Sequence, residues 1–320
     1  MNASDAESLR SDLTRHDRTK SLDSFNQRQV TNMQTANRTV VVTGSTGGIG
    51  AEIAKLLAND GWHLALVNRS HEKTERQISE LREAHPRSTF RAYTADMMDL
   101  SQIARVTEQI RSECTGIAGL YLVAGLLTNR RLTSEQGVEG HFAVNTLAPY
   151  LFTQKLRATL SAASSAEHKS FVVNFSSSAI GGVRSLDVDD LANPSEIGGL
   201  FGAYAKTKLA ITVATRFLEA ELAHEGVLIY AVDPGATKTS MTGSGDGMPW
   251  FIRLLQPVLF KAADAQARKL VSAVDRAVTD GQSGLYIAED RVKTPPRLVS
   301  DQTTQAKLRT LLERYVEPYA

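Results

Sequence analysis

Cysteine, net charge and long apolar runs are all scarce in this 320-residue chain, and each scarcity excludes a class of protein. Cys114 is the only cysteine, so intramolecular disulfides and a cysteine metal cluster are excluded, and a reducing compartment, the cytoplasm, is expected. The formal net charge is +1, which indicates neither a nucleic-acid partner nor attraction to a strongly charged membrane surface. No window approaches the roughly 18 uninterrupted apolar residues of a membrane span, and we predict no metal site.

Residues 1–38 have the composition of a polar, partly disordered extension. They mix charges of both signs with Ser, Thr, Asn and Gln, and they contain no apolar run long enough for a signal peptide. Asp5, Glu7 and Asp12 argue against a mitochondrial transit peptide, which is poor in acidic residues. An amphipathic helix docked on the domain, with Leu9 and Leu13 one turn apart, is the alternative.

From residue 39 onward, short apolar runs alternate with longer amphipathic stretches, as in an α/β protein. Strands are expected at 40–42, 63–68, 89–94, 120–124, 171–175, 227–232 and 285–288. Helices are expected at 49–59, 72–84, 101–113, 135–160, 203–224, 262–279 and in the tail 301–319. This order predicts a doubly wound, Rossmann-type parallel sheet in a single domain over 39–290, followed by a helical tail over 291–320.

Two segments, 180–199 and 239–261, interrupt the alternation. Long irregular segments in a compact domain are usually binding loops. The second contains the apolar stretch 247–260, so we predict that it covers the substrate site as a lid, which suits an apolar substrate. A short helix packed on the core and a patch that touches a membrane are the alternatives.

A glycine-rich turn, Thr-Gly-Ser-Thr-Gly-Gly-Ile-Gly at 43–50, lies between the first expected strand and the first expected helix. Glycines at 44, 48 and 50 let a backbone approach a pyrophosphate, which the helix N-terminus attracts. The second strand ends in Asn68-Arg69-Ser70, without the carboxylate that commonly holds the ribose of NAD. Arg69 can pair with a phosphate, so NADP(H) is favoured; the alternative is NAD(H) with Asn68 on the ribose and Arg69 solvated.

A candidate proton-transfer group lies in the second half of the chain. Tyr204 and Lys208 are one helical turn apart, so they share a helix face, and an ammonium nearby favours the phenolate of a tyrosine that ordinarily titrates at about 10. The spacing is common by chance and gains weight only from the glycine turn upstream. Three consecutive serines, 176–178, follow the strand 171–175, whose carboxyl end is where open α/β sheets bind ligands.

Together, Thr-Gly-x-x-x-Gly-x-Gly at 43–50 and Tyr-x-x-x-Lys at 204–208 resemble the short-chain dehydrogenase/reductase family, over roughly 39–290. The resemblance implies hydride transfer between a nicotinamide cofactor and a carbonyl or alcohol. It implies that Ser177 holds the substrate oxygen, that Tyr204 is the acid or base, and that Lys208 lowers the pKa of Tyr204 and binds the nicotinamide ribose. It also implies that Asn145 holds a water linked to Lys208, with a purely structural hydrogen bond as the alternative.

The whole predicted cofactor site has eighteen members. They are Gly44, Ser45, Thr46, Gly48, Ile49, Gly50, Asn68, Arg69, Asp96, Met97, Ala124, Gly125, Tyr204, Lys208, Pro234, Gly235, Thr237 and Thr239. Asp96 matches the family position that contacts adenine, and its alternative role is the N-cap of the next helix. The turn 233–239 resembles the family's Pro-Gly turn near the nicotinamide, and its alternative is a plain end of a strand. Where the family commonly has Asn-Asn-Ala-Gly this chain has Leu-Val-Ala-Gly at 122–125, which puts the bonding between strands in doubt.

Further features resemble the retinol-dehydrogenase-like branch of the family. They are the pattern over 131–152 and the long loop between Ser177 and Tyr204. That resemblance implies a small-molecule substrate, an apolar aldehyde, ketone or secondary alcohol, and a homodimer through the helices 135–160 and 203–224. Two other classes stay open: a non-catalytic NAD(P)-binding regulatory protein, and an epimerase or dehydratase with tightly bound NAD. The first usually lacks the tyrosine or lysine, and the second usually has Gly-x-x-Gly-x-x-Gly, which this chain does not match.

Overall fold

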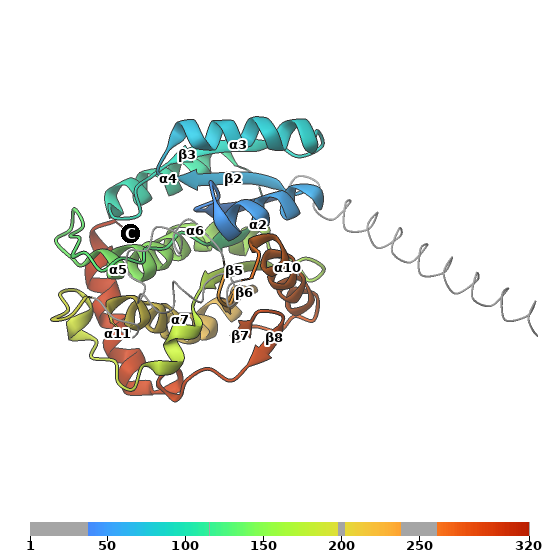
Figure 1. The fold of residues 1–320 in the computed structure, drawn as a ribbon. Coiled ribbons are helices and arrows are strands. Elements are labelled where there is room, and N and C mark those ends of the chain that lie inside the picture. Colours follow the sequence, from blue (N-terminus) through green and yellow to red (C-terminus); the bar gives the residue numbers. More distant parts are fainter. Residues whose placement is uncertain (1–37, 115, 198–201, 238–260, 320) are drawn as a thin grey trace, which may run out of the picture.

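A computed structural model describes residues 38–114, 116–197, 202–237 and 261–319. In these residues, one eight-stranded sheet has the order β3-β2-β1-β4-β5-β6-β7-β8 (Figure 1). The strands are β1 (Thr39–Thr43), β2 (His63–Asn68), β3 (Phe90–Thr94), β4 (Ile117–Leu122), β5 (Ser170–Phe175), β6 (Val227–Asp233), β7 (Leu285–Ala288) and β8 (Arg291–Lys293). All neighbouring strands are parallel except β7 and β8. The predicted doubly wound, Rossmann-type sheet is therefore confirmed.

Helices cover both faces of the sheet (Figure 1). They are α2 (Gly48–Asn59), α3 (His71–Ala84), α4 (Leu100–Glu113), α5 (Gly140–Phe142), α6 (Ala148–Ala163), α7 (Ala203–Ala223), α10 (Ala263–Thr279) and α11 (Gln302–Val316). Alternate residues of a strand face opposite sides. Val40 and Val42 of β1 therefore pack with α2, α3 and α10, whereas Val41 packs with α4, α6, α7 and α11. Within the described ranges, no helix is both long and apolar enough to cross a bilayer.

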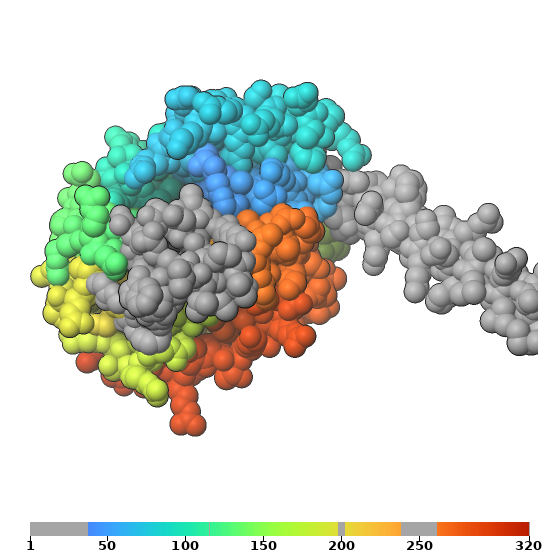
Figure 2. Space-filling model, in the orientation of Figure 1, coloured from blue at the N-terminus to red at the C-terminus, as the bar shows by residue number. Residues whose placement is uncertain are grey.

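The strand order reverses at β1, which lies between β2 and β4. The first crossovers run from β1 through α2 to β2, and the chain returns to the other side of β1 at β4. The crevice outside the carboxyl ends of β1 and β4 is where such sheets bind nucleotides. In Figure 2 the segments from β1 to α4 (blue to cyan) and those from α10 onward (orange to red) form opposite sides of the visible face.

The expected helix over 135–160 is wrong in its first turn. Glu139 has an extended backbone (φ −63°, ψ 139°), and its carboxylate accepts hydrogen bonds from the N–H groups of His141 and Phe142. It is an N-cap, so helix begins only at Gly140 and continues through a π-helical turn, η1 (Ala143–Leu147), into α6. The strand expected at 120–124 also differs, since β4 spans 117–122, and β8 was not expected at all.

The expected helix in the tail is confirmed as α11, which lies along α7 (Figure 1). Its apolar side chains are buried in the core that α4, α6 and α7 share, and they are Leu308, Leu311, Leu312 and Val316. The Arg309 guanidinium lies 4.7 Å from the ring centroid of Phe217 and pairs with Glu221. The apolar face of α11 is therefore part of the hydrophobic core.

We expect Leu312→Ala to lower the free energy of unfolding by about 2–5 kcal/mol, because it removes a fully buried side chain and leaves a cavity between α11 and α7. Urea unfolding followed by circular dichroism measures the loss. Lys307→Ala, at an exposed position of the same helix, is the control and should change it by less than about 0.5 kcal/mol. Equal effects of the two substitutions would mean that α11 is not part of the cooperative core.

Candidate active site

The glycine turn presses against the carboxyl end of β4. Gly44 has φ +71°, in the left-handed region, and a Cβ there would lie 2.9 Å from the Cα atom of Ala124. A Cβ on Gly50 would lie 2.3 Å from the carbonyl oxygen of Gly44, so the first turn of α2 also needs glycine. These contacts bring the backbone of the turn, the start of α2 and the predicted Ala124-Gly125 pair to one point.

Asn68 and Ser45 hold the turn from the side of β2. The Asn68 side chain donates to the Ser45 hydroxyl at 2.9 Å and accepts from the N–H of Thr46 at 3.3 Å. Gln77 of α3 donates to the Ser45 carbonyl oxygen at 2.7 Å, a contact that sequence reasoning missed. Ser45 is fully buried, so it shapes the turn from beneath. Both ends of the Asn68 amide are engaged with the turn.

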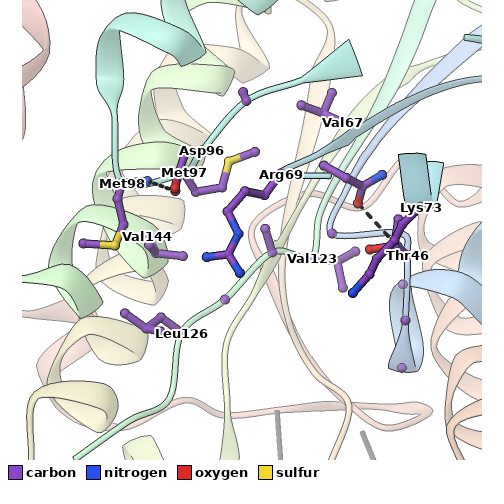
Figure 3. Close-up of a pocket in the computed structure, with 18 of the residues that line it drawn as sticks. Thr46, Val67, Arg69, Lys73, Asp96, Met97, Met98, Val123, Leu126 and Val144 are labelled. Carbon is purple, nitrogen blue, oxygen red and sulfur yellow. Dashed lines mark hydrogen bonds between the residues drawn. The ribbon is translucent and has the colours of Figure 1, made fainter. Parts of the chain in front are cut away.

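A pocket of about 540 Å³ opens where the turn, β2, β3 and β4 meet (Figure 3). Eleven predicted cofactor residues line it: Gly44, Thr46, Gly48, Ile49, Gly50, Asn68, Arg69, Asp96, Met97, Ala124 and Gly125. Sequence reasoning missed the other lining residues, which are Gly47, Val67, Lys73, Ala95, Met98, Val123, Leu126, Leu127 and Val144. Lys73 lies four residues after Arg69, in the first turn of α3, so its spacing was a usable signal. The apolar lining residues come from segments that meet only in the fold, which no local pattern reveals.

The basic groups of the pocket lie at the end of β2 and the start of α3. Arg69, Lys73 and Thr46 are all exposed. In Figure 3 the Arg69 side chain reaches into the middle of the pocket, whereas Lys73 lies at the Thr46 end. The N-terminus of α2, with its free N–H groups, opens on the same pocket. This combination of cations and helix N-terminus suits a ligand with several phosphates.

Asp96 is not the N-cap of α4, so that alternative is wrong. The cap is Asp99, whose carboxylate accepts from the N–H of Ser101 at 2.9 Å. Asp96 instead lies on the pocket wall, where its Oδ1 accepts from the N–H of Met98 at 2.9 Å (Figure 3).

The three serines after β5 have different surroundings, and only the middle one contacts Tyr204. The Ser176 hydroxyl is buried and lies 2.7 Å from the Thr212 hydroxyl of α7. Ser178 is exposed, on the short helix η2 (Ser178–Gly182). The Ser177 side chain lies beside the phenol of Tyr204 and acts to lower its pKa. The geometry thus agrees with the choice of Ser177 over its neighbours.

Tyr204 and Lys208 project from the first turns of α7. Burial raises the pKa of Tyr204, and the neighbouring Ser177 side chain acts in the opposite direction. The Lys208 ammonium donates to the carbonyl oxygen of Phe175, at the end of β5, at 2.7 Å. Burial lowers the pKa of Lys208 to about 8. Burial therefore favours the neutral form of both groups.

Asn145 lies in the π-helical turn η1 and connects three segments. Its side chain accepts from the N–H of Leu126 at 2.8 Å and donates to the Leu126 carbonyl oxygen at 3.0 Å. It also donates to the Thr207 hydroxyl, next to Lys208, at 3.2 Å. The amide therefore links the loop after β4 to α7. These are structural hydrogen bonds, and π-helical turns are frequent at functional sites.

Two residues just before η1 hold the same loop. His141 Nδ1 lies 2.8 Å from the Glu139 carboxylate, and its Nε2 accepts from the N–H of Thr128 at 3.2 Å. Both side chains are almost fully buried. At the other side of this region, Ala124 donates its N–H to the Thr43 hydroxyl at 3.2 Å. This bond ties the end of β4 to β1, directly after positions 122 and 123, where the family commonly has two asparagines.

The Pro234–Gly235 turn leaves β6 at the same edge of the sheet. The Thr237 hydroxyl donates to the carbonyl oxygen of Gly235 at 3.0 Å, and Gln266 of α10 donates to that of Pro234 at 2.5 Å. The predicted contact of Thr239 lies outside the described residues, and so do residues 239–260 of the lid predicted over 239–261 and residues 1–37 of the extension predicted over 1–38.

An open parallel sheet with a glycine turn and a basic pocket at its switch point defines a dinucleotide-binding α/β protein. A family model described as short chain dehydrogenase matches residues 38–187. The chain is 31% identical to mouse retinol dehydrogenase 12, over 81% of this chain and 80% of that protein. It is 28% identical to human polyprenol dehydrogenase, over 85% of this chain and 83% of that protein.

Solved structures agree on the fold. One is a short-chain dehydrogenase from Sphingobium yanoikuyae in complex with NADPH (TM-score 0.62, 20% identity, 87% of this chain and 95% of that one). Another is the Pseudomonas aeruginosa RhlG/NADP active-site complex (TM-score 0.63, 23% identity, 80% of this chain and 95% of that one). The chain belongs to the short-chain dehydrogenase/reductase family, in its retinol-dehydrogenase-like branch, and is an NAD(P)-dependent oxidoreductase.

The burial of Lys208 makes stability depend on pH. Its pKa in the folded state, about 8, is below the ordinary 10.5, so the unfolded chain holds this proton more tightly. The destabilisation is complete below pH 8 and disappears as the pH rises to 10.5. We expect the unfolding free energy of the parental protein, relative to Lys208→Met, to rise by up to roughly 3 kcal/mol across this window.

Urea unfolding at about pH 7 and about pH 10 measures this difference. Lys307→Met, at an exposed lysine, serves as the control and should show no comparable dependence. A difference between parental protein and Lys208→Met that is the same at both pH values would contradict the prediction.

Proposed function

We propose that this protein reduces an apolar aldehyde or ketone with NADPH, with Tyr204 as the proton donor, and oxidises the corresponding alcohol by the reverse steps. The observation that carries the proposal is that Ser177, at the carboxyl end of β5, lies beside the Tyr204 phenol. Two neighbouring hydroxyl groups can both turn to one carbonyl oxygen. Asn145 and its partner Leu126 connect this pair to the wall of the cofactor pocket.

In this mechanism, bound NADPH supplies the hydride. Ser177 and Tyr204 hold the carbonyl oxygen, and Tyr204 gives it a proton as negative charge develops. Lys208 supplies positive charge below the phenol and holds the nicotinamide ribose. Asn145 fixes the start of α7 and the water that returns a proton towards Lys208.

The environment of Tyr204 suits a proton donor. Burial raises the pKa of the phenol, which favours its protonated form. A proton donor must be protonated before the reaction, whereas a base must not be. Alcohol oxidation would therefore need the charge of the oxidised cofactor and of Lys208 to lower this pKa first.

The basic end of the pocket supports NADP(H) over NAD(H). Arg69 and Lys73 both line the pocket close to the end of β2, where the adenosine ribose binds in dinucleotide folds. The Asn68 amide, the alternative ligand of an NAD ribose, is already bonded to Ser45 and Thr46. The two similar structures, which are complexes with NADPH and NADP, agree with this preference.

The names of the relatives support an apolar substrate, since retinol and polyprenols are apolar alcohols. The alternatives of a regulatory protein or an epimerase gain no support from the geometry, because Asn145, Ser177, Tyr204 and Lys208 are all present around one site. We also propose the catalytic domain limits 39–290 and, on the single cysteine, the cytoplasm as location.

We also propose a homodimer through α6 and α7, and the packing of α11 limits the surface that this dimer can use. This helix already covers a side of α7, so a second copy can use only the remaining surface of α6 and α7.

Tyr204→Phe tests the proposed function. It keeps the ring but removes the proton donor, so the rate of carbonyl reduction should fall by about 10²–10⁴-fold. NADPH affinity, measured by fluorescence titration, should stay within about threefold because the ring and Lys208 remain. Tyr319→Phe, at the far end of the tail, is the control. Turnover at the parental rate by Tyr204→Phe would refute the assignment.

Arg69→Ala and Lys73→Ala test the cofactor preference. Each removes one charged partner of a phosphate, so we expect the KM for NADPH to rise by roughly 10–100-fold with little change for NADH. Arg76→Ala is the control, because Arg76 is an exposed cation of α3 that pairs with Glu72. Equal losses with both cofactors would show that these side chains do not read the 2′-phosphate.

A further inference from the structure

A buried carboxylate lies next to the turn that carries Ser177 and has no part in the proposed proton transfer. Asp233 is the last residue of β6 and is 6% exposed. Its Oδ1 accepts from the N–H of Gly235 at 2.9 Å, and its carboxylate lies beside the N–H of Ser178. One side chain is thus next to both the serine turn after β5 and the Pro-Gly turn after β6.

Tyr286 of β7 extends this group of contacts. Its phenol lies beside the side chains of both Asp233 and Ser176. The Ser176 hydroxyl lies 2.7 Å from that of Thr212, which donates to the carbonyl oxygen of Lys208 at 2.8 Å. A series of polar contacts therefore runs from β7 past the serine turn to the helix that carries Tyr204 and Lys208.

The surroundings of Asp233 fit an ionised carboxylate. Its polar neighbours are two N–H groups and a phenol, all of which can donate, and an ionised carboxylate only accepts. Burial raises the pKa of Asp233, and the main-chain hydrogen bonds oppose that shift. The charged groups that face it are Glu289 and Lys293, on the β7–β8 hairpin, and the titratable phenol of Tyr204 faces it from α7.

We propose that Asp233 and Tyr286 are positioning residues that hold Ser177 against Tyr204 and keep the serine turn in register with the Pro-Gly turn. The proposal rests on the proposed function, because it concerns the groups assigned to proton transfer. Neither residue touches the reacting atoms. Each acts through main-chain or side-chain atoms of the two turns.

The charge of Asp233 adds an electrostatic effect to this geometry. The Asp233 carboxylate raises the pKa of Tyr204, as burial does, whereas the neighbouring Ser177 side chain lowers it. A negative group near a phenol disfavours the phenolate. Loss of the Asp233 charge should therefore lower the pH at which Tyr204 loses its proton.

Asp233→Asn keeps the shape of the side chain but removes the charge and sets an amide N–H₂ against the donors around it. We expect kcat for carbonyl reduction to fall by about tenfold or more. We also expect the alkaline limb of kcat/KM against pH to move down by roughly 0.5 pH unit. Asp290→Asn, an exposed aspartate of the neighbouring hairpin, is the matched control and should leave both unchanged.

Tyr286→Phe is the milder second variant and keeps the proposal testable if Asp233→Asn folds poorly. It removes one hydroxyl group but leaves the carboxylate, so kcat should fall by about three- to tenfold without the shift of the alkaline limb. In the double variant the two losses of kcat should not multiply, since both residues act through the contact between the Tyr286 phenol and the Asp233 carboxylate. Multiplying losses would contradict the pairing.

Two results would overturn the proposal. One is parental kcat and an unmoved pH profile in Asp233→Asn, and the other is a loss of kcat with an unmoved profile, which a merely structural role produces. Failure of the proposed function looks different, because Tyr204→Phe would then turn over normally whatever the Asp233 variants did.

Discussion

The contact between the backbone of Gly44 and the Cα atom of Ala124 is the constraint on which the rest of the site depends. Only a turn without a side chain can approach β4 this closely. The approach brings the start of α2 to the switch point of the sheet, so its free N–H groups face the same crevice as the loops after β2, β3 and β4. With a larger residue at either position, the helix end and the pocket wall would move apart.

Around this constraint, side chains are held mainly by main-chain atoms in and just after the strands. Asn145 bonds both polar atoms of the Leu126 backbone in the loop after β4, Lys208 donates to the Phe175 carbonyl oxygen, and Asp233 accepts from the N–H of Gly235. The sheet fixes the strand ends from which these loops start. Side chains held in this way keep the small separations that proton transfer needs.

The parts of the fold that local pattern controls could be predicted from the sequence. The strand over 63–68 and the helix over 203–224 follow from short apolar runs and helical spacing, and the structure has them within one residue. The helix over 135–160 failed at its start because the apolar pattern does not reveal that Glu139 caps a later helix. Asn145, in its π-helical turn, bonds Leu126 in another segment, a partner that no local pattern reveals.

In the candidate site, too, residues whose role is local could be predicted, and residues whose role depends on tertiary contacts could not. Glycines 44 and 50 are recognisable because their geometry is local, and the structure explains why each needs to be glycine. Lys73 was missed although its spacing from Arg69 was visible. The partner of Lys208 could not have been foreseen, since it is the carbonyl oxygen of Phe175, 33 residues away on another element. Roles that arise from tertiary contacts need the structure.

The packing of α11 on α7 also bears on how the chain is made. Translation delivers the sheet and α7 well before residues 302–316 emerge, so the apolar side of α7 is uncovered for that interval. An uncovered apolar helix on a nearly complete domain is a surface for chaperones or for association with other nascent chains. The last helix is therefore the step that ends this exposure, and a chain that stops before it would keep an adhesive surface.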